Sequence, residues 1–336
     1  MIQIIGLGPG SSDSITIGTL EILKKSNRIF LRTSMHPCVD FIRSQGVEFQ
    51  TLDFLYESSK SFEEVYEKIA NLIADESFLY SEVCYAVPGN PKVAEKSVEI
   101  LINICKLKNI DFKVYPAVSF LDNVFYRLNI DPIDGIQILD GANIFESIID
   151  RRKGIIICQV YDEFIASDVK IFLNKYFNDE KQIYFLKSLG IDEDEVIEKI
   201  ELMNLDKMKD IDHLTSVYVP PSKDEIDFKY DIFDLMKIIS FLGGENECDF
   251  NKKQTGKDLM KYLIEEVYDL DSAIKNDNIA NIIEEMGNVL VNIIFLCQLE
   301  SFYDMFDFID VTDSICKKLI YRYPHIDKNH KRFRYC

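Results

Sequence analysis

The feature that most limits the fold of this chain is a change of hydrophobic pattern that follows the Pro220-Pro221 pair. Before this pair, short β-branched runs alternate with amphipathic helical stretches, as in a parallel sheet covered by helices. After Tyr230, apolar residues recur only at helical spacing. One switch of this kind predicts two structural parts, and a length of 336 residues agrees with about two domains.

The predicted fold is an α/β two-lobed part followed by an all-α helical bundle. The first part covers 1–222, with lobes at about 1–115 and 116–222 and a mixed sheet in the second lobe. Residues 223–231 form the predicted linker, because prolines end the last strand and charged residues follow. Residues 232–336 form the helical part, whose core we expect a partner copy to complete.

Individual helices follow from apolar residues at helical spacing. In the first part they include Ile15–Lys25, Phe62–Ala74, Pro91–Cys105 and Ala166–Tyr176. In the second part they are Ile232–Phe241, Gly256–Lys275, Ile279–Glu300 and Asp310–Tyr321.

The net charge of −19 and the scattered cysteines indicate the surroundings of the protein. The charge argues against nucleic acid or an anionic membrane as a partner, although a bound dication inverts the local sign for a nucleotide. The eight cysteines include no C-x-x-C pair, so we expect reduced, mostly buried thiols. No basic leader and no uninterrupted apolar stretch of about 18 residues is present. We therefore expect a cytoplasmic protein without a membrane segment.

Two pairs of oxygen-bearing side chains lie on the predicted C-terminal helices. Glu266 and Asp269 are three residues apart, as are Glu285 and Asn288, so each pair shares one helix face. Two such helices facing each other would supply the hard oxygen ligands that Mg²⁺ needs. Acidic residues at this spacing are also common on solvated faces, and Asn288 is uncharged. The pattern predicts a divalent-cation site with less negative charge than four carboxylates would give.

Three loops rich in glycine and proline follow predicted strands of the first lobe. They are Gly6–Gly10, Pro88–Pro91 and Pro116–Phe120. The first loop alone fits a plain tight turn equally well, and Pro9 interrupts the spacing of a dinucleotide fingerprint. Because the carboxyl ends of parallel strands meet at one edge of a sheet, the three together predict a ligand cleft.

These loops carry a resemblance to a known family. Together with Arg32-Thr33, His36-Pro37 and the run His213–Pro221, they resemble the tetrapyrrole (corrin/porphyrin) methylase family, in its YabN-type branch that carries a MazG domain. The resemblance spans residues 1 to about 222. It implies a two-lobed methyltransferase fold that binds S-adenosylmethionine between the lobes, usually as a homodimer.

The resemblance also implies a set of cofactor contacts. They fall on Pro9, Gly89, Asn90, Val93, Ser119, Phe120, Gln159 and Val160. Asn90 stands where many members have an aspartate, which removes a negative charge beside the sulfonium. Because the sulfonium is an activated donor, catalysis requires mainly in-line positioning of the acceptor. We assign no general base, and we expect a hydrogen-bonded structural role for His36.

The stretch from about Leu235 to Ile326 resembles the MazG family of nucleoside triphosphate pyrophosphohydrolases. The matching runs are Cys248–Asn251, Gln254-Thr255, Glu265–Asp269, Glu285–Asn288, Lys318-Leu319 and Arg322–His325. In that family an E-E-x-x-E helix and an E-x-x-D helix hold Mg²⁺, which activates water and gives a nucleoside monophosphate and pyrophosphate.

The MazG resemblance implies catalytic roles for Glu266, Asp269 and Glu285, and magnesium ligation by these three with Asn288. Asp269 replaces a glutamate and is one methylene shorter, while Asn288 replaces an aspartate. Gly256 stands where the family often has a histidine. Cations in the last predicted helix fit phosphate binding and complementation of the helix dipole equally.

Three functional hypotheses follow. In the first, the chain is a bifunctional-type protein with a S-adenosylmethionine-binding methylase-like part and a magnesium-dependent pyrophosphohydrolase part. In the second, it is a catalytically degenerate sensor or scaffold that binds S-adenosylmethionine or a nucleotide. In the third, it methylates an unknown acceptor and uses the helical part for dimerisation. All three imply small-molecule ligands, no nucleic-acid or membrane partner, and a homodimer or higher homo-oligomer.

Overall fold

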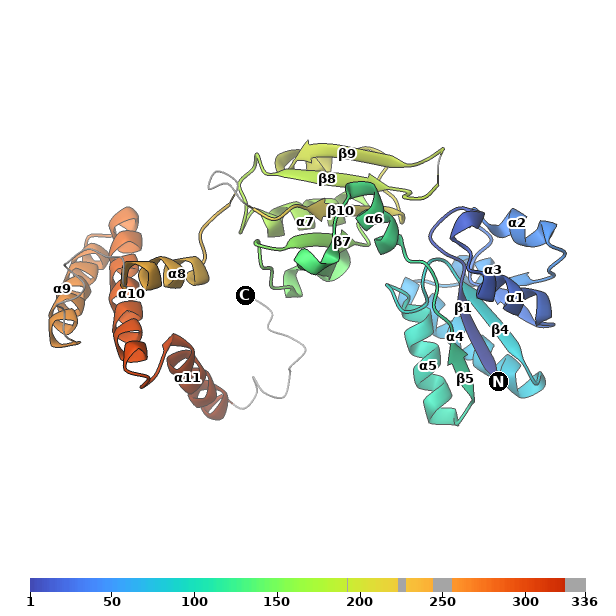
Figure 1. Ribbon diagram of the computed structural model, residues 1–336, viewed down its shortest axis with the longest axis horizontal. Helices are drawn as coiled ribbons and strands as arrows, with labels where there is room; N and C mark the ends of the chain where they lie inside the picture. Colours follow the sequence, from blue (N-terminus) through green and yellow to red (C-terminus); the bar gives the residue numbers. More distant parts are fainter. Residues whose placement is uncertain (192, 223–227, 244–255, 324–336) are drawn as a thin grey trace. The chain divides into compact units, whose positions relative to one another are not determined.

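The structure is a computed structural model that describes residues 1–191, 193–222, 228–243 and 256–323 (Figure 1). It divides into two compact units, Met1–Phe228 and Lys229–Cys336. The division falls within the predicted linker, of which residues 223–227 lie outside the described part. The predicted motif residues 248–251, 254–255 and 324–326 also lie outside it.

The first lobe is built on a five-stranded sheet with the order β3-β2-β4-β1-β5. Every neighbouring pair of strands is parallel. Strands β1 and β4 lie inside the sheet and are buried throughout, which explains why Gln3 is the only polar residue in these two strands. The strands are β1 (Ile2–Gly6), β2 (Ile29–Leu31), β3 (Gln50–Thr51), β4 (Val83–Val87) and β5 (Phe112–Val114).

Helices cover both faces of this sheet, and the alternation of side chains along each strand shows it. Ile4 of β1 and Tyr85 of β4 join one apolar cluster with α4 and α5, whereas the next residues, Ile5 and Ala86, join a second cluster with α1 and α2. The helices of this lobe are α1 (Ile17–Lys25), α2 (Val39–Ser44), α3 (Asp53–Glu57), α4 (Phe62–Leu79) and α5 (Lys96–Lys108).

The predicted start of one helix is wrong. The sequence places a helix at Pro91–Cys105, but α5 begins only at Lys96. Ala94 has a φ of +52°, and a residue in this left-handed region cannot continue a right-handed helix. Glu95 is the N-cap residue of α5. The loop after β4 is therefore longer than predicted and contains Glu95.

The second lobe has a five-stranded sheet with the order β6-β7-β10-β8-β9. The sheet is mixed, as the sequence predicts. Only β6 and β7 are parallel. Helix α7 packs on one face, beside Ile157, and α6 packs on the other, beside Ile156. The elements are α6 (Phe120–Leu128), β6 (Ile136–Asp140), β7 (Gly154–Cys158), α7 (Glu163–Leu173), β8 (Gln182–Lys187), β9 (Val196–Glu201) and β10 (Thr215–Val219).

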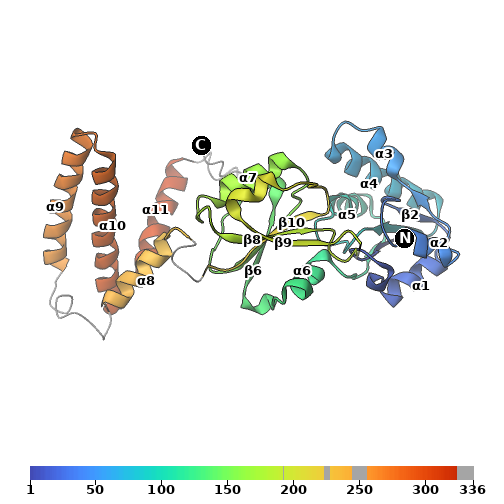
Figure 2. The ribbon, with the colours of Figure 1, turned by 90° about the horizontal axis from the view of Figure 1, so that it is seen from above.

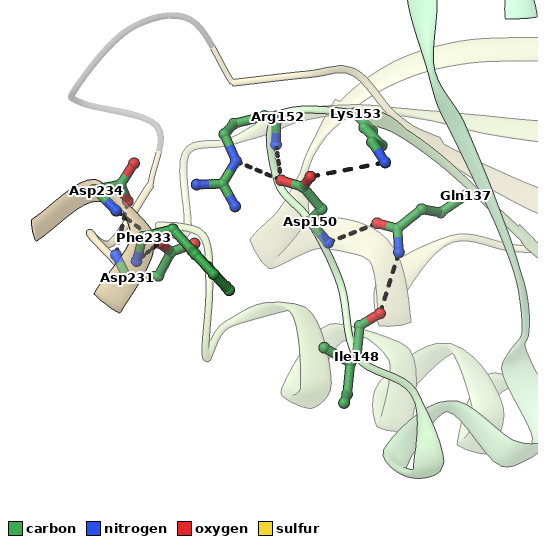
Figure 3. Close-up of polar contacts among 8 residues, drawn as sticks. All are labelled: Gln137, Ile148, Asp150, Arg152, Lys153, Asp231, Phe233 and Asp234. Carbon is green, nitrogen blue, oxygen red and sulfur yellow. Dashed lines mark hydrogen bonds and ion pairs between the residues drawn. The ribbon is translucent and has the colours of Figure 1, made fainter. Parts of the chain in front are cut away.

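The loop that joins β6 and β7 is held by side-chain hydrogen bonds that close on the β6 residue Gln137 (Figure 3). Gln137 accepts from the backbone N–H of Asp150 at 2.6 Å and donates to the carbonyl of Ile148 at 3.2 Å. The carboxylate of Asp150 pairs with Arg152 at 2.6 Å and approaches Lys153 at 4.0 Å. These contacts fix the return of the chain into the buried strand β7.

The second unit is helical in its described part. Helices α9 and α10 lie side by side as a hairpin (Figure 2), and Asp277 between them has a φ of +49°. Asp231 starts α8, because its carboxylate accepts from the N–H groups of Phe233 and Asp234 at 2.8 and 3.1 Å (Figure 3). The helices are α8 (Ile232–Gly243), α9 (Gly256–Lys275), α10 (Ile279–Phe302) and α11 (Phe308–Arg322).

Helix α10 is both apolar and largely exposed. It has 24 residues and a mean hydropathy of 1.5, enough in length and composition to cross a membrane, with 6% of the apolar window buried. The sequence analysis predicted this helix but counted isolated polar residues as interruptions, so it did not identify it as long and apolar enough to cross a membrane. A single helix of this kind is weak evidence for a membrane segment. In α10 the acidic pair Glu284-Glu285 interrupts the apolar surface.

The described cysteines are free thiols, as expected. They are buried at Cys38, Cys84, Cys105, Cys158 and Cys297 and exposed at Cys316, whereas Cys248 and Cys336 lie outside the described residues.

Candidate functional sites

The three predicted ligand loops meet at one edge of the first sheet. Gly8 and Gly89 exchange two backbone hydrogen bonds of 2.8 and 3.2 Å. A Cβ atom on Gly6 would lie 2.2 Å from the carbonyl oxygen of Gly89 and 2.6 Å from the Cβ of Ala117. Glycine at position 6 therefore allows the first loop to touch both others.

Asn90 joins the second loop to the third. Its Nδ2 donates to the carbonyl oxygen of Ala117 at 2.5 Å, and its Oδ1 accepts from the N–H of Lys92 at 2.9 Å. The backbone carbonyl of Asn90 accepts from Val93 at 3.0 Å. An aspartate could not donate to Ala117, so the amide at this position has a structural use that the sequence did not reveal.

The remaining predicted contacts differ in what they can offer a ligand. Ser119 is buried and caps α6, since its hydroxyl accepts from Leu121 at 3.1 Å while Asp122 accepts from its N–H at 2.7 Å. Pro9 and Phe120 are half-buried. The hydroxyl and the N–H of Ser119 are therefore both engaged in capping α6.

Gln159 and Val160 follow β7 in the second lobe. Gln159 is half-buried and has a φ of +59°, which turns the chain sharply after the strand. The side chain of Val160 is fully buried in the core of this lobe. Val160 is buried as a whole residue, and its contact with a cofactor stays a prediction.

A further contact ties the two lobes together beside these loops. The N–H of Ser11 in the first lobe donates to the carbonyl oxygen of Gly190 in the second at 3.2 Å. Within the second lobe, Asn123 donates to the carbonyl of the preceding residue, Leu189, at 2.9 Å. A Cβ on Gly10 would lie 2.3 Å from the oxygen of Gly190. The sequence analysis missed Gly190, because nothing in the sequence around this glycine indicates that it lies against Gly10.

His36 has the hydrogen-bonded role that the sequence predicts. Its Nε2 donates to the carbonyl oxygen of Gly8 at 3.0 Å, and its Nδ1 lies 2.9 Å from the Sγ of Cys38. Burial, and secondarily the charge of Arg32, lowers the pKa of His36 to about 4. The ring is therefore neutral at pH 7 and supports the first ligand loop.

A buried ion pair lies at the same edge of the sheet. The Nη1 of Arg32 donates to the Oε2 of Glu95 at 2.7 Å, and their side chains are 20% and 3% exposed. Burial opposes the charge of Arg32, but Glu95 and the surrounding phenols outweigh it, so the pKa of Arg32 lies above its ordinary value. The sequence analysis did not single out Glu95, because it is 63 residues from its partner.

In the second unit, three carboxylates converge. One oxygen atom each from Glu266 and Asp269 of α9 and from Glu285 of α10 lie within 4.8 Å of one another. Glu266 and Glu285 are half-buried and Asp269 is exposed. Within the described ranges none of the three forms an ion pair with a lysine or arginine. Carboxylates this close without a cation repel one another.

Asn288 completes this group. Its Nδ2 donates to the Oε2 of Glu285 at 3.1 Å. Burial raises the pKa of Glu266, a hydrogen bond with Asn288 lowers it, and contact with Glu285 and the charge of Asp269 raise it, with a net upward shift. Asn288 thus lies against the three carboxylates, whose oxygens fit the hard-oxygen preference of a divalent cation such as Mg²⁺.

The chain matches two family models. The model described as tetrapyrrole (corrin/porphyrin) methylases matches residues 1–206, and the MazG nucleotide pyrophosphohydrolase domain matches residues 254–327.

Among individual proteins, Bacillus subtilis YabN is 36% identical over 330 residues, which cover 98% of this chain and 67% of YabN. The nucleoside triphosphate pyrophosphohydrolase/pyrophosphatase MazG of Thermotoga maritima is 37% identical over 93 residues, or 28% of this chain and 36% of that protein. A crystal structure of uroporphyrin-III-C-methyltransferase from Thermus thermophilus aligns with a TM-score of 0.52 at 16% identity, covering 66% of this chain and 94% of that one. At this identity the likeness concerns the fold alone.

Proposed function

Because the chain belongs to the tetrapyrrole (corrin/porphyrin) methylase family and carries a MazG nucleotide pyrophosphohydrolase domain, we propose that it combines two activities. The first unit binds S-adenosylmethionine and methylates a small acceptor. The second unit hydrolyses a nucleoside triphosphate to the monophosphate and pyrophosphate, with Mg²⁺. Both families are enzyme families, so turnover is proposed for each unit.

The observation that carries the hydrolase half is the group of carboxylates without a cationic partner. Glu266, Asp269 and Glu285 would hold the ion through carboxylate oxygens, and Asn288 through its carbonyl oxygen. Bound Mg²⁺ would polarise the phosphates and lower the pKa of the attacking water. Asp269 is the shortest and most exposed of the three carboxylates, so it leaves room for water or a substrate phosphate beside the ion.

Pyrophosphate release from a panel of nucleoside triphosphates at millimolar Mg²⁺ tests this half. Glu285→Gln removes a charged ligand, and we expect a loss of about 100-fold or more. Glu284→Gln is the matched control, because Glu284 is the exposed neighbour in the same helix and lies outside the cluster. Asn288→Asp should strengthen Mg²⁺ binding about tenfold or more, since it restores a negative charge beside the dication.

The hydrolase proposal fails if neither the natural protein nor Asn288→Asp releases pyrophosphate from any triphosphate. Saturable nucleotide binding by calorimetry without product would then favour the sensor or scaffold hypothesis.

The methylase half is supported by the convergence of the three glycine- and proline-rich loops. S-adenosylmethionine would lie against Pro9, Gly89, Asn90 and Val93 from the first lobe. From the other side it would meet Ser119, Phe120, Gln159 and Val160. Because Asn90 supplies no carboxylate, the main-chain carbonyls of these loops would face the sulfonium.

Calorimetric titration with S-adenosylhomocysteine tests this half. Gly6→Ala places a methyl group against Gly89 and Ala117 and should abolish binding. Gly18→Ala is the control, because the nearest atom to its Cβ is 3.9 Å away. Equal affinity in the two variants, or no binding by the natural protein, contradicts the proposed site.

We also propose that the protein acts in the cytoplasm as a homodimer or higher homo-oligomer. The free thiols support the compartment. The exposed apolar residues of the helical unit, such as Ile279, Ile283 and Met286 on α10, support the association.

A further inference from the structure

The Arg32–Glu95 ion pair lies beside the proposed cofactor loops. Arg32 directly follows β2, and its N–H donates to the carbonyl of Ala86 on β4 at 2.9 Å. Glu95 lies in the loop after β4, two residues beyond Val93. Both charges are therefore placed at the carboxyl edge of the sheet, next to the loop that carries Gly89 and Asn90.

The carboxylate of Glu95 is fully engaged. Its Oε2 accepts from Arg32, and its Oε1 accepts from the hydroxyl of Ser97 at 2.7 Å. The Ser97 hydroxyl lies 2.7 Å from that of Tyr85. Ala94, directly before Glu95, keeps a left-handed backbone without being glycine, and strain of this kind persists where the surroundings impose it. The ion pair is thus built into the lobe.

The guanidinium of Arg32 is incompletely used. Its Nε is buried and has no hydrogen-bond partner among the described residues. Buried donors in folded proteins nearly always have an acceptor, so the unused N–H points to a ligand oxygen. Because Glu95 already balances the charge, the expected acceptor is a neutral oxygen.

Aromatic side chains from both lobes surround this position. Tyr56 and Tyr66 are close enough to Arg32 for its charge to oppose the rise that burial causes in the pKa of each phenol. Phe62 stacks on Tyr66 with ring centroids 6.3 Å apart and meets Tyr161 edge-on at 6.2 Å. Tyr161 directly follows the proposed cofactor contacts Gln159 and Val160.

The charged groups around the Tyr161 ring are acidic. Asp162, Asp140 and Glu63 all raise the pKa of Tyr161, behind the effect of burial. A ligand with several carboxylates would meet this acidic rim and an arginine that is already paired. A neutral ligand with an aromatic or aliphatic flank avoids that repulsion and gains contact with Phe62 and Tyr161.

We propose that Arg32, Tyr56, Phe62, Tyr66 and Tyr161 form the acceptor site of the first unit, and that it takes a neutral ligand that carries an amide or carbonyl group, such as a peptide segment. The proposal rests on the proposed methyltransferase function. In the transfer the acceptor nucleophile bonds to the methyl carbon as the S–C bond breaks, S-adenosylhomocysteine leaves, and the acceptor proton passes to water. Arg32 binds and positions the acceptor oxygen.

The test uses the full chain saturated with S-adenosylhomocysteine and two probes, the blocked dipeptide acetyl-Phe-Gly-amide and the tricarboxylate tricarballylate. Calorimetry gives the affinities, and ¹⁵N-arginine NMR follows the Nε–H resonances. We expect the dipeptide to bind and to shift one Nε–H signal, which is missing in Arg32→Lys. The dipeptide Kd should rise about 10- to 100-fold in Arg32→Lys, because a charge-assisted hydrogen bond is lost.

Arg43→Lys is the matched control, because Arg43 also pairs with a carboxylate, Asp40, at 3.1 Å and lies over an aromatic ring, Phe49. It should leave the dipeptide Kd unchanged. Tyr161→Ala is a second variant for the case in which Arg32→Lys fails to fold. Tyr161 is 37% exposed, so its replacement should leave the fold intact. The dipeptide Kd of Tyr161→Ala should rise about threefold or more, because an aromatic contact is lost.

Three results would overturn the acceptor site: no dipeptide binding, tighter binding of tricarballylate, or an unchanged dipeptide Kd in both Arg32→Lys and Tyr161→Ala. A failure of the proposed methyltransferase function gives a different result, because the natural protein would then not bind S-adenosylhomocysteine at all. Binding of S-adenosylhomocysteine without binding of the dipeptide rejects only the acceptor site.

Discussion

At the scale of single residues, two asparagines stand where the family resemblances imply acidic residues, and the structure uses them differently. Asn90 ties two loops together through its Nδ2, which an aspartate lacks. Asn288 lies within a group of carboxylates, where its amide lowers the local charge and donates to Glu285. The same substitution is therefore structural at the first position and electrostatic at the second.

Replacement of Asn90 by aspartate should destabilise the first unit. The variant loses the donor to Ala117 and leaves a carboxylate facing a carbonyl, at a cost of about 1–3 kcal/mol in the free energy of unfolding. Urea unfolding of the full chain measures it. Asn71→Asp is the control, because Asn71 also donates to a carbonyl but on the exposed face of α4. Equal losses in both variants would show that the Ala117 contact contributes nothing.

The neutral His36 predicts a pH dependence of stability. Its pKa is about 4 in the folded protein and about 6.5 when unfolded, so the unfolded chain binds the proton first. The contribution of neutral His36 to the free energy of unfolding is therefore present above about pH 6.5. It is lost as the pH falls towards 4, by up to about 3 kcal/mol. Unfolding of the natural protein and of His36→Gln between pH 7 and 4 isolates this contribution. A parallel fall in both proteins would contradict the assigned burial.

At the scale of elements, the helices of the second unit follow the sequence closely. Helix α9 covers the predicted range Gly256–Lys275, and α10 begins at the predicted Ile279. Periodicity of 3.6 residues is a local signal, and so is the i, i+3 spacing that pairs Glu266 with Asp269 and Glu285 with Asn288. The approach of the two helices is a contact between distant residues, and the sequence indicated it only through the MazG resemblance.

Elements and contacts that depend on distant residues could not be predicted. Strand β9 has the mixed sequence VIEKIE of an exposed edge strand, whose existence depends on pairing with β8. The start of α5 depends on the left-handed Ala94. The Arg32–Glu95 pair joins two loops that only the parallel sheet brings together. For the same reason no sequence pattern marked the acceptor site.

The exposed apolar face of α10 predicts self-association. Ile283 is 68% exposed and Met286 is 57% exposed. We expect light scattering to give at least twice the chain mass of 39.0 kDa for the natural protein. Ile283→Asp places a charge on this face and should shift the mass towards that of one chain. Lys275→Glu, at the exposed end of α9, is the control, and an unaltered mass in Ile283→Asp would place the interface elsewhere.

At the scale of the whole molecule, the two candidate sites belong to different compact units of one acidic chain. Removal of divalent cations should therefore act on one activity only. With EDTA we expect pyrophosphate release to cease and the Kd for S-adenosylhomocysteine to stay constant. Calorimetry in EDTA and in excess Mg²⁺ measures the second quantity. A change in that Kd would reveal coupling between the units.

The backbone contact between Gly10 and Gly190 bears on how ligands would enter and leave the first unit. Main chain meets main chain there, and the Ser11 N–H donates to the Gly190 carbonyl, so this contact holds the two lobes together on that side. If the first unit turns over as proposed, we expect ligands to enter and leave on the margin that carries Phe62 and Tyr161. A departing S-adenosylhomocysteine would then have to wait for the methylated product to clear its way.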